Sequence, residues 1–107
     1  MPKLYEYFGL IIMFYANEHE PVHVHGKSQG REARAEFIIR AEFIIIEGEV
    51  IEINFAEVTG RQPLQPNEMR YFKEIVTAKT NEIVQKWIDF FVLHKHVTAE
   101  NITRRLK

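Results

Sequence analysis

Alternating hydrophobic and polar positions dominate the first half of the chain and predict β-strands. Residues 9–15 are apolar at both alternating positions, which is typical of a central strand covered on both faces. From Arg31 the period is two, with apolar side chains on one face and charged side chains on the other, which predicts a half-buried strand. Residues 26–30, Gly-Lys-Ser-Gln-Gly, have the composition of a turn, so we expect them to join two antiparallel strands.

An internal repeat lies within the strand that begins at Arg31: Ala-Glu-Phe-Ile-Ile occupies residues 35–39 and again 41–45. Because the two copies are an even number of residues apart, both present the same faces. We predict a three-residue turn over 47–49, which places Phe43 opposite Ile53. The repeat also permits a second register, in which Phe37 takes the place of Phe43, and the long apolar strand offers a sheet edge for a homodimer.

A helical period replaces the alternation in the second half. Residues 59–66 contain glycine and proline and predict a loop, with Asn67 as the helix N-cap. Two apolar stripes at helical spacing follow, and the polar segment 77–82 between them predicts a break near Thr80, with one continuous helix as the alternative. Residues 94–107 are compatible with a strand or a short helix.

These elements predict an α+β fold: a small antiparallel, meander-like sheet of about five strands, packed against one long or kinked C-terminal helix or a helix pair. We expect a single domain over residues 1–107, strand-rich over 8–56 and helical over 67–93, with a tail over 94–107. The chain has 107 residues, of which 46% are hydrophobic, so it can bury a core of its own.

Composition narrows the class of protein. The chain has no cysteine, which excludes disulfides and thiolate ligands and suits the reducing cytoplasm. The longest apolar run, residues 8–16, is shorter than the roughly 20 residues of a membrane helix, so we expect a cytoplasmic protein without a membrane span. The net charge of −1 excludes a global field that would attract nucleic acid, although the tail is locally basic.

The most unusual chemistry in the sequence is the distribution of histidines, which fall in two clusters. The clusters are His19, His23 and His25, and His94 with His96. His23 and His25 are two residues apart on an extended segment, so their side chains should share a sheet face, and His19 lies in the loop before them. We expect His94 and His96 to be structural.

Three readings of the first cluster are open. His19, His23 and His25 could bind zinc or another divalent transition metal, which would acidify a bound water. Alternatively, they could act on an RNA phosphodiester as acid and base, while Lys27 or Arg31 stabilises the charge of the phosphorane. In the third reading they are structural residues, hydrogen-bonded to the backbone or to carboxylates.

Two adjacent motifs carry a resemblance to a known family. Residues 8–15, Phe-Gly-Leu-Ile-Ile-Met-Phe-Tyr, precede residues 17–25, Asn-Glu-His-Glu-Pro-Val-His-Val-His. Together they resemble the opening signature of the bacterial family known as domain of unknown function 4160, and the likeness extends over roughly the first ninety residues. The chain departs from the family pattern at Val22, where a second proline is frequent, and in its duplicated hexapeptide.

The resemblance implies a compact β-rich domain with a C-terminal helix, encoded beside another small domain in pairs that look like toxin and antitoxin. Our first hypothesis is a toxin–antitoxin-like component that acts on RNA, with His23 and His25 as acid and base, His19 in support and a cognate small protein from a neighbouring gene as partner. The second is a non-catalytic protein-binding or dimerisation module whose histidines are structural or hold a metal.

Overall fold

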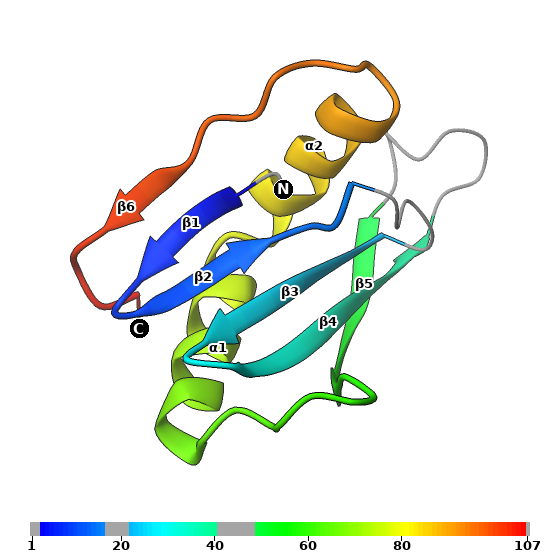
Figure 1. Cartoon of the computed structure of the whole chain (residues 1–107). Coiled ribbons are helices and arrows are strands. Elements are labelled where there is room, and N and C mark those ends of the chain that lie inside the picture. Colours follow the sequence, from blue (N-terminus) through cyan, green and yellow to red (C-terminus); the bar gives the residue numbers. More distant parts are fainter. Residues whose placement is uncertain (1–2, 17–21, 41–48, 107) are drawn as a thin grey trace.

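The computed structural model describes residues 3–16, 22–40 and 49–106 and confirms the α+β class (Figure 1). The elements, in chain order, are β1 (Lys3–Tyr7), β2 (Leu10–Met13), β3 (His23–Ser28), β4 (Arg31–Arg40), β5 (Glu49–Glu57), α1 (Pro66–Ala78), α2 (Thr80–Phe91) and β6 (Glu100–Ile102). No helix in these ranges is long and apolar enough to cross a membrane.

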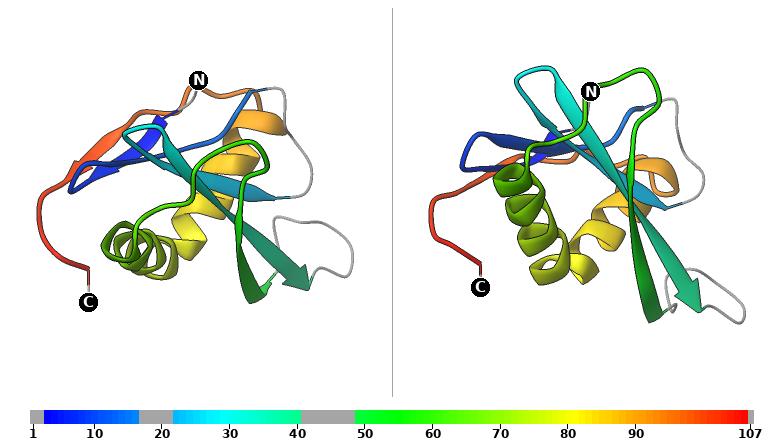
Figure 2. Two further views of the ribbon diagram at one scale, coloured as in Figure 1. Left: turned by 60° about the horizontal axis from the view of Figure 1, so that its bottom comes forward. Right: turned by 90° about the horizontal axis from the view of Figure 1, so that it is seen from below.

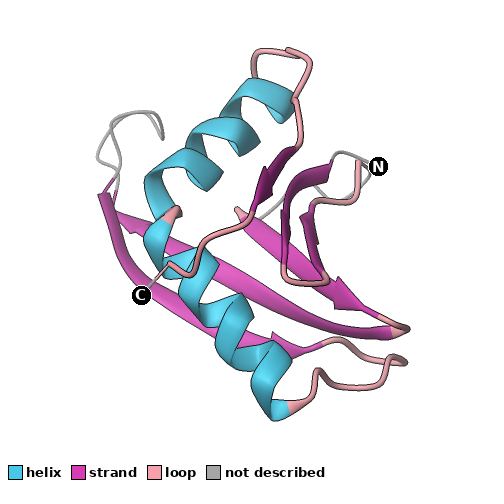
Figure 3. Cartoon of the chain, turned by 90° about the vertical axis from the view of Figure 1, so that its left-hand side faces the viewer, coloured by secondary structure: helices cyan, strands magenta, loops and turns pink. Residues whose placement is uncertain are grey.

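All of these strands form a single sheet in the order β5-β4-β3-β2-β1-β6. Strands β1 to β5 make an antiparallel meander, as predicted, and β6 from the C-terminal tail adds a parallel strand beside β1. Both helices lie on the same side of the sheet (Figures 2 and 3). Among the described residues, the other side of the sheet therefore carries no helix.

Strand β2 has the central position that its apolar sequence predicts, between β1 and β3. Its coverage is less complete than expected. Leu10 and Ile12 are buried, whereas Ile11, which points to the side without helices, is 37% exposed. An apolar run thus predicted the position of the strand correctly and the covering of its second face only in part.

The predicted register between β4 and β5 is wrong. Phe37, and not Phe43, pairs with Ile53, which is the second register that the repeat permits, and a β-bulge between Ile38 and Ile39 shifts the following pairs. The predicted three-residue turn over 47–49 falls in the connection between β4 and β5, whose residues 41–48 lie outside the described residues, as does Phe43. Because both copies of the repeat present the same faces, the hydrophobic alternation could not distinguish the two registers.

The two helices begin and end close to the predicted positions. α1 ends at Ala78 and α2 begins at Thr80, which confirms the predicted break. The N-cap is Gln65 and not Asn67, because Pro66 occupies the first helical position, where its fixed φ suits the helix and its missing N–H is not needed. The Glu68 carboxylate accepts the backbone N–H of Gln65 at 2.8 Å, which satisfies a donor at the helix start.

The hydrophobic core fills the space between the helices and the sheet. Its largest buried side chains include Tyr5, Tyr7, Phe14, Phe72, Ile75, Ile83 and Ile88, and Trp87 also belongs to it, as expected for an aromatic residue at helical spacing. α1 approaches β3 closely at Gly26, where a Cβ would lie 2.6 Å from the ring of Phe72. This contact fixes the position of α1 against the sheet and identifies the helix-facing side of β3.

Candidate functional site

The two described histidines of the first cluster lie side by side on β3. Gly26 faces α1, so its neighbour His25, and His23 two residues earlier, project from the side of the sheet without helices. The centroids of their rings are 5.1 Å apart, which confirms the predicted common face. Both side chains are buried, with residue exposures of 1% for His23 and 3% for His25.

A buried carboxylate from β4 contacts His25. His25 Nδ1 lies 2.9 Å from Glu32 Oε2, and Glu32 is only 1% exposed. The hydroxyl of Tyr15 donates to both Glu32 oxygens, at 3.1 and 3.2 Å, and the Tyr15 ring packs edge-on against His25 at 4.7 Å. Arg61 Nε approaches the same carboxylate at 3.6 Å from the loop after β5. The group formed by Tyr15, His23, His25, Glu32 and Arg61 is called the buried histidine network below.

The chemistry of this network is that of an oriented imidazole. A carboxylate that contacts Nδ1 fixes the orientation of a histidine ring, an arrangement found both in catalytic pairs and behind metal-bound histidines. It also satisfies polar groups that would otherwise be costly to bury. Because both rings are almost fully covered, the described contacts match the stabilising role more closely than a role in binding substrate.

The structure separates the other predicted site residues. Lys27 lies on the same face as the histidines, with its ammonium 5.5 Å from the centroid of the Tyr15 ring. Arg31 lies on the opposite face and binds Glu68, so it is not near the network. His19 lies outside the described residues, and His94 and His96 are exposed in the segment after α2.

Metal coordination finds no support in the described ranges. Within residues 3–16, 22–40 and 49–106, no three histidine or acidic side chains come together in a way that could hold a metal ion. His23, His25 and Glu32 therefore do not form such a group by themselves. A metal site that includes His19 stays a prediction.

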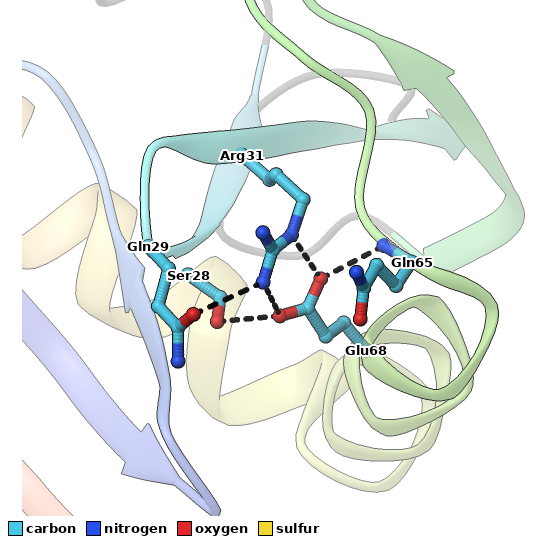
Figure 4. A network of polar contacts seen from close by, with 5 residues as sticks. All are labelled: Ser28, Gln29, Arg31, Gln65 and Glu68. Atoms are coloured by element: carbon cyan, nitrogen blue, oxygen red, sulfur yellow. Dashed lines mark hydrogen bonds and ion pairs between the residues drawn. The ribbon is translucent and has the colours of Figure 1, made fainter.

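Arg31 belongs to a polar network that attaches α1 to the turn between β3 and β4 (Figure 4). Its guanidinium donates to both oxygens of Glu68, at 2.7 and 2.6 Å. The hydroxyl of Ser28 also donates to Glu68, at 2.7 Å, and the backbone of Gln65 completes the set. These hydrogen bonds, that from Arg31 first, lower the pKa of the Glu68 carboxyl to about 2.

The lowered pKa predicts a specific acid sensitivity. A carboxyl whose pKa is about 2 in the folded state and near its ordinary value of 4.5 in the unfolded state stabilises the fold above pH 4.5 and loses this contribution as the pH falls toward 2. We expect Glu68→Gln to lower the free energy of unfolding by about 2 kcal/mol at pH 6, and to differ little from wild type near pH 2. Urea unfolding across this range measures both, and an undiminished difference at pH 2 would contradict the assignment.

A groove of about 910 Å³ runs along the outer face of α1, bounded on its other side by the C-terminal tail. It is lined by Pro66, Met69, Arg70, Lys73, Glu74, Thr77, Ala78, Arg105 and Leu106, and is called the α1 groove below. Figure 3 shows the tail lying beside α1. The lining residues of α1 recur at intervals of three and four, so they form one face of the helix. Because they run from Pro66 to Ala78, the groove extends along the whole helix.

The tail is held in place by polar contacts with α1 and β1. Arg105 binds the Glu74 carboxylate through two nitrogens, and the buried Tyr7 hydroxyl donates to Glu74 and accepts the Leu106 N–H, each at 2.8 Å. The hydrogen bonds from Arg105 lower the pKa of Glu74 and raise that of Arg105. Arg105 also lies over the Tyr71 ring at 4.7 Å. The wall of the groove is therefore an ordered part of the fold.

A comparison with protein-family models identifies the chain's relatives. Residues 9–88 match the model of the domain of unknown function DUF4160. The chain belongs to the DUF4160 family. No curated protein and no solved structure shows significant similarity to it.

The range matched by the DUF4160 model includes the buried histidine network and α1 with its groove-lining residues. It does not include β1, β6 or the tail that carries Arg105 and Leu106. The α1 groove of this DUF4160 protein is thus built partly from the family domain and partly from a C-terminal segment beyond the match.

Sequence reasoning found the histidines and missed the groove. Arg70, Lys73 and Thr77 are spaced as one exposed face of a helix, which was a visible signal. Nothing in the sequence placed Arg105 against that face, because the contact between Arg105 and Glu74 depends on the return of the tail beside β1. The pairing of Glu32 with His25 was not predicted, because it follows from the register of β3 and β4.

Proposed function

We propose that this DUF4160 protein is a non-catalytic module that binds another protein through the α1 groove, and that the buried histidine network stabilises its sheet. The groove carries the proposal, because it is large, is lined by apolar as well as cationic side chains and lies on an ordered surface. Protein-binding sites combine apolar contact area with a few charged groups in this way.

An action on RNA, our first hypothesis, has less support from the geometry. A general acid or base must lie within hydrogen-bond reach of the proton that it moves. With exposures of 1% and 3%, the rings of His23 and His25 present almost no surface to a phosphodiester. Arg31, one of the two cations suggested for the phosphorane, binds Glu68 on the other side of the sheet. These contacts favour a structural role for both histidines.

The partner that we propose is a cognate small protein from a neighbouring gene, as in a toxin–antitoxin-like pair. Isothermal titration with that purified protein tests the role of the groove. We expect Ala78→Arg, which places a long side chain in the groove, to weaken the complex at least tenfold, and Ala99→Arg, at an exposed position outside the groove, to leave it unchanged. Equal affinities for both variants would contradict the proposal.

An RNA degradation assay distinguishes the action on RNA from the non-catalytic function. When the purified protein is incubated with total RNA, we expect the RNA to stay intact over hours, both with wild type and with a His23→Ala/His25→Ala variant. Gel analysis of RNA length measures the outcome. Cleavage by wild type that disappears in a His23→Gln variant with an unchanged circular dichroism spectrum would show a catalytic role and overturn the proposal.

A further inference from the structure

We infer that the α1 groove binds an acidic amphipathic helix of the partner protein. The inference rests on the proposed function, since it describes the chemistry of the segment that the same groove would hold. Four features of the groove support the inference. They are its shape, its apolar floor, its excess of positive charge, and the cations that lie over the aromatic rings beside it.

The shape fits a helix. α1 has 13 residues and is therefore about 20 Å long, which matches a partner helix of roughly three and a half turns. The small exposed side chains of Thr77 and Ala78 lie at its C-terminal end, where they permit close approach of a second helix. A groove between a helix and an ordered tail is the geometry in which amphipathic helices bind, with apolar residues at positions i, i+3 or i+4, and i+7.

The floor of the groove offers apolar contacts along its length. Pro66 and Met69 supply them near the start of α1, Ala78 at its end, and Leu106 from the tail. Pro66 and Ala78 are exposed and Met69 is half-buried, so a partner would bury surface that faces solvent in the free protein. A purely polar or extended polyanionic ligand would leave this apolar surface unused.

The charge of the groove is unbalanced toward positive. Three cations line it, Arg70, Lys73 and Arg105, against a single anion, Glu74. Glu74 already accepts hydrogen bonds from Arg105 and Tyr7. Within the described parts of the chain, no carboxylate forms an ion pair with Arg70 or Lys73. Both side chains are exposed, and the Glu74 carboxylate, which attracts Arg70, is already bound by Arg105. This excess of positive charge favours glutamate or aspartate on the partner.

The aromatic residues beside the groove argue against a nucleic acid. Single-stranded nucleic acids bind where bases stack on open aromatic faces. The ring of Tyr71 is covered by the guanidinium groups of Arg105 and Arg70, at 4.7 and 5.7 Å from its centroid, and by the edge of Tyr7. Lys73 similarly lies 5.5 Å from the centre of the Phe55 ring. The lining of the groove therefore offers cations and aliphatic surface, and the exposed ring of Phe8, 5.7 Å from that of Tyr71, lies outside this lining.

A displayed-peptide selection tests the inference. A library of random 14-residue helical peptides is selected on the immobilised wild-type protein and depleted on an Arg70→Glu/Lys73→Glu variant. We expect the enriched peptides to share the i, i+4, i+7 apolar pattern with flanking Glu or Asp, and to bind the double variant at least tenfold more weakly than wild type by fluorescence anisotropy. Their affinity should also fall as salt is raised.

The matched control is Lys86→Glu/Arg104→Glu. Lys86 lies over the Tyr5 ring as Lys73 lies over Phe55, and Arg104 is exposed in the tail, so the control makes the same change in net charge outside the groove. It should bind the enriched peptides like wild type. Thermal unfolding verifies that both double variants are folded.

The possible failures differ in what they overturn. Enriched peptides that depend on the groove and lack acidic residues would contradict the inference and leave the proposed function standing. Enriched peptides that bind equally to wild type and to Ala78→Arg would contradict both. Tight binding of a labelled oligouridine that is lost in the Arg70→Glu/Lys73→Glu variant would identify a nucleic acid as the ligand of the groove and contradict the inference. A monomer–dimer equilibrium altered by the same variant would identify a second copy of the chain as the ligand and also contradict it.

Discussion

Replacing Glu32 with alanine is expected to lower the free energy of unfolding by about 3 kcal/mol, the cost of leaving buried polar groups without their shared acceptor. Glu32 is 1% exposed, accepts the bifurcated hydrogen bond of the Tyr15 hydroxyl and contacts His25 at 2.9 Å. Without the carboxylate, these buried polar groups lose the acceptor that they share. Urea unfolding followed by circular dichroism measures the change.

Glu36 provides the matched control on the same strand and face. Its carboxylate pairs with Arg34 at 3.0 Å, but both side chains are about one-third exposed. Because such pairs contribute little, Glu36→Ala should cost less than about 1 kcal/mol. Glu32→Gln, which keeps an acceptor oxygen, should fall between the two alanine variants. A Glu32→Ala protein as stable as Glu36→Ala would refute the structural role of the network.

Replacing Gly26 with valine is expected to lower the free energy of unfolding by about 3 kcal/mol, although valine favours strands. The new Cβ would lie 2.6 Å from Cδ1 and 2.8 Å from Cε1 of Phe72, whose ring is fully buried and cannot move aside. The helix would have to shift away from β3. Thermal or urea unfolding measures the loss.

Two variants show whether this steric contact is the cause. Lys27→Val lies on the same strand and on the opposite face, so it should cost at most about 1 kcal/mol, the contribution of its contact with the Tyr15 ring. Combining Gly26→Val with Phe72→Leu should cost less than the sum of the single changes, because the smaller side chain leaves room for the new one. Strict additivity would contradict the contact.

The homodimer predicted through the sheet edge stays a prediction. β5 is one edge of the sheet and has nine residues, long enough to pair with another strand. It carries exposed Glu52 and Glu57, and charged residues on an edge strand oppose pairing with a second copy of the same strand. The α1 groove is therefore the surface for which the structure offers the stronger argument.

The sequence by itself determined the fold class and the order of the elements from β2 to α2. Period-two alternation identified β2 to β5, and helical spacing identified α1 and α2 with the break near Thr80, because secondary structure follows local periodicity. β1 lies before the segment predicted to be rich in strands, and the segment that contains β6 was compatible with a strand or a short helix. It also placed His23 and His25 on one face, since that follows from their spacing on a strand. These properties depend on neighbours in the chain and can be read without knowledge of the packing.

Only the tertiary structure decided the register of β4 and β5, the burial of the histidines and the existence of the α1 groove. The even repeat makes Phe37 and Phe43 equivalent by pattern, so the choice of partner for Ile53 depends on the whole sheet. The contacts of Glu32 with Tyr15 and of Arg105 with Glu74 join residues 17 and 31 positions apart. Contacts of this kind depend on how strands and tail return to the sheet, which local periodicity does not encode.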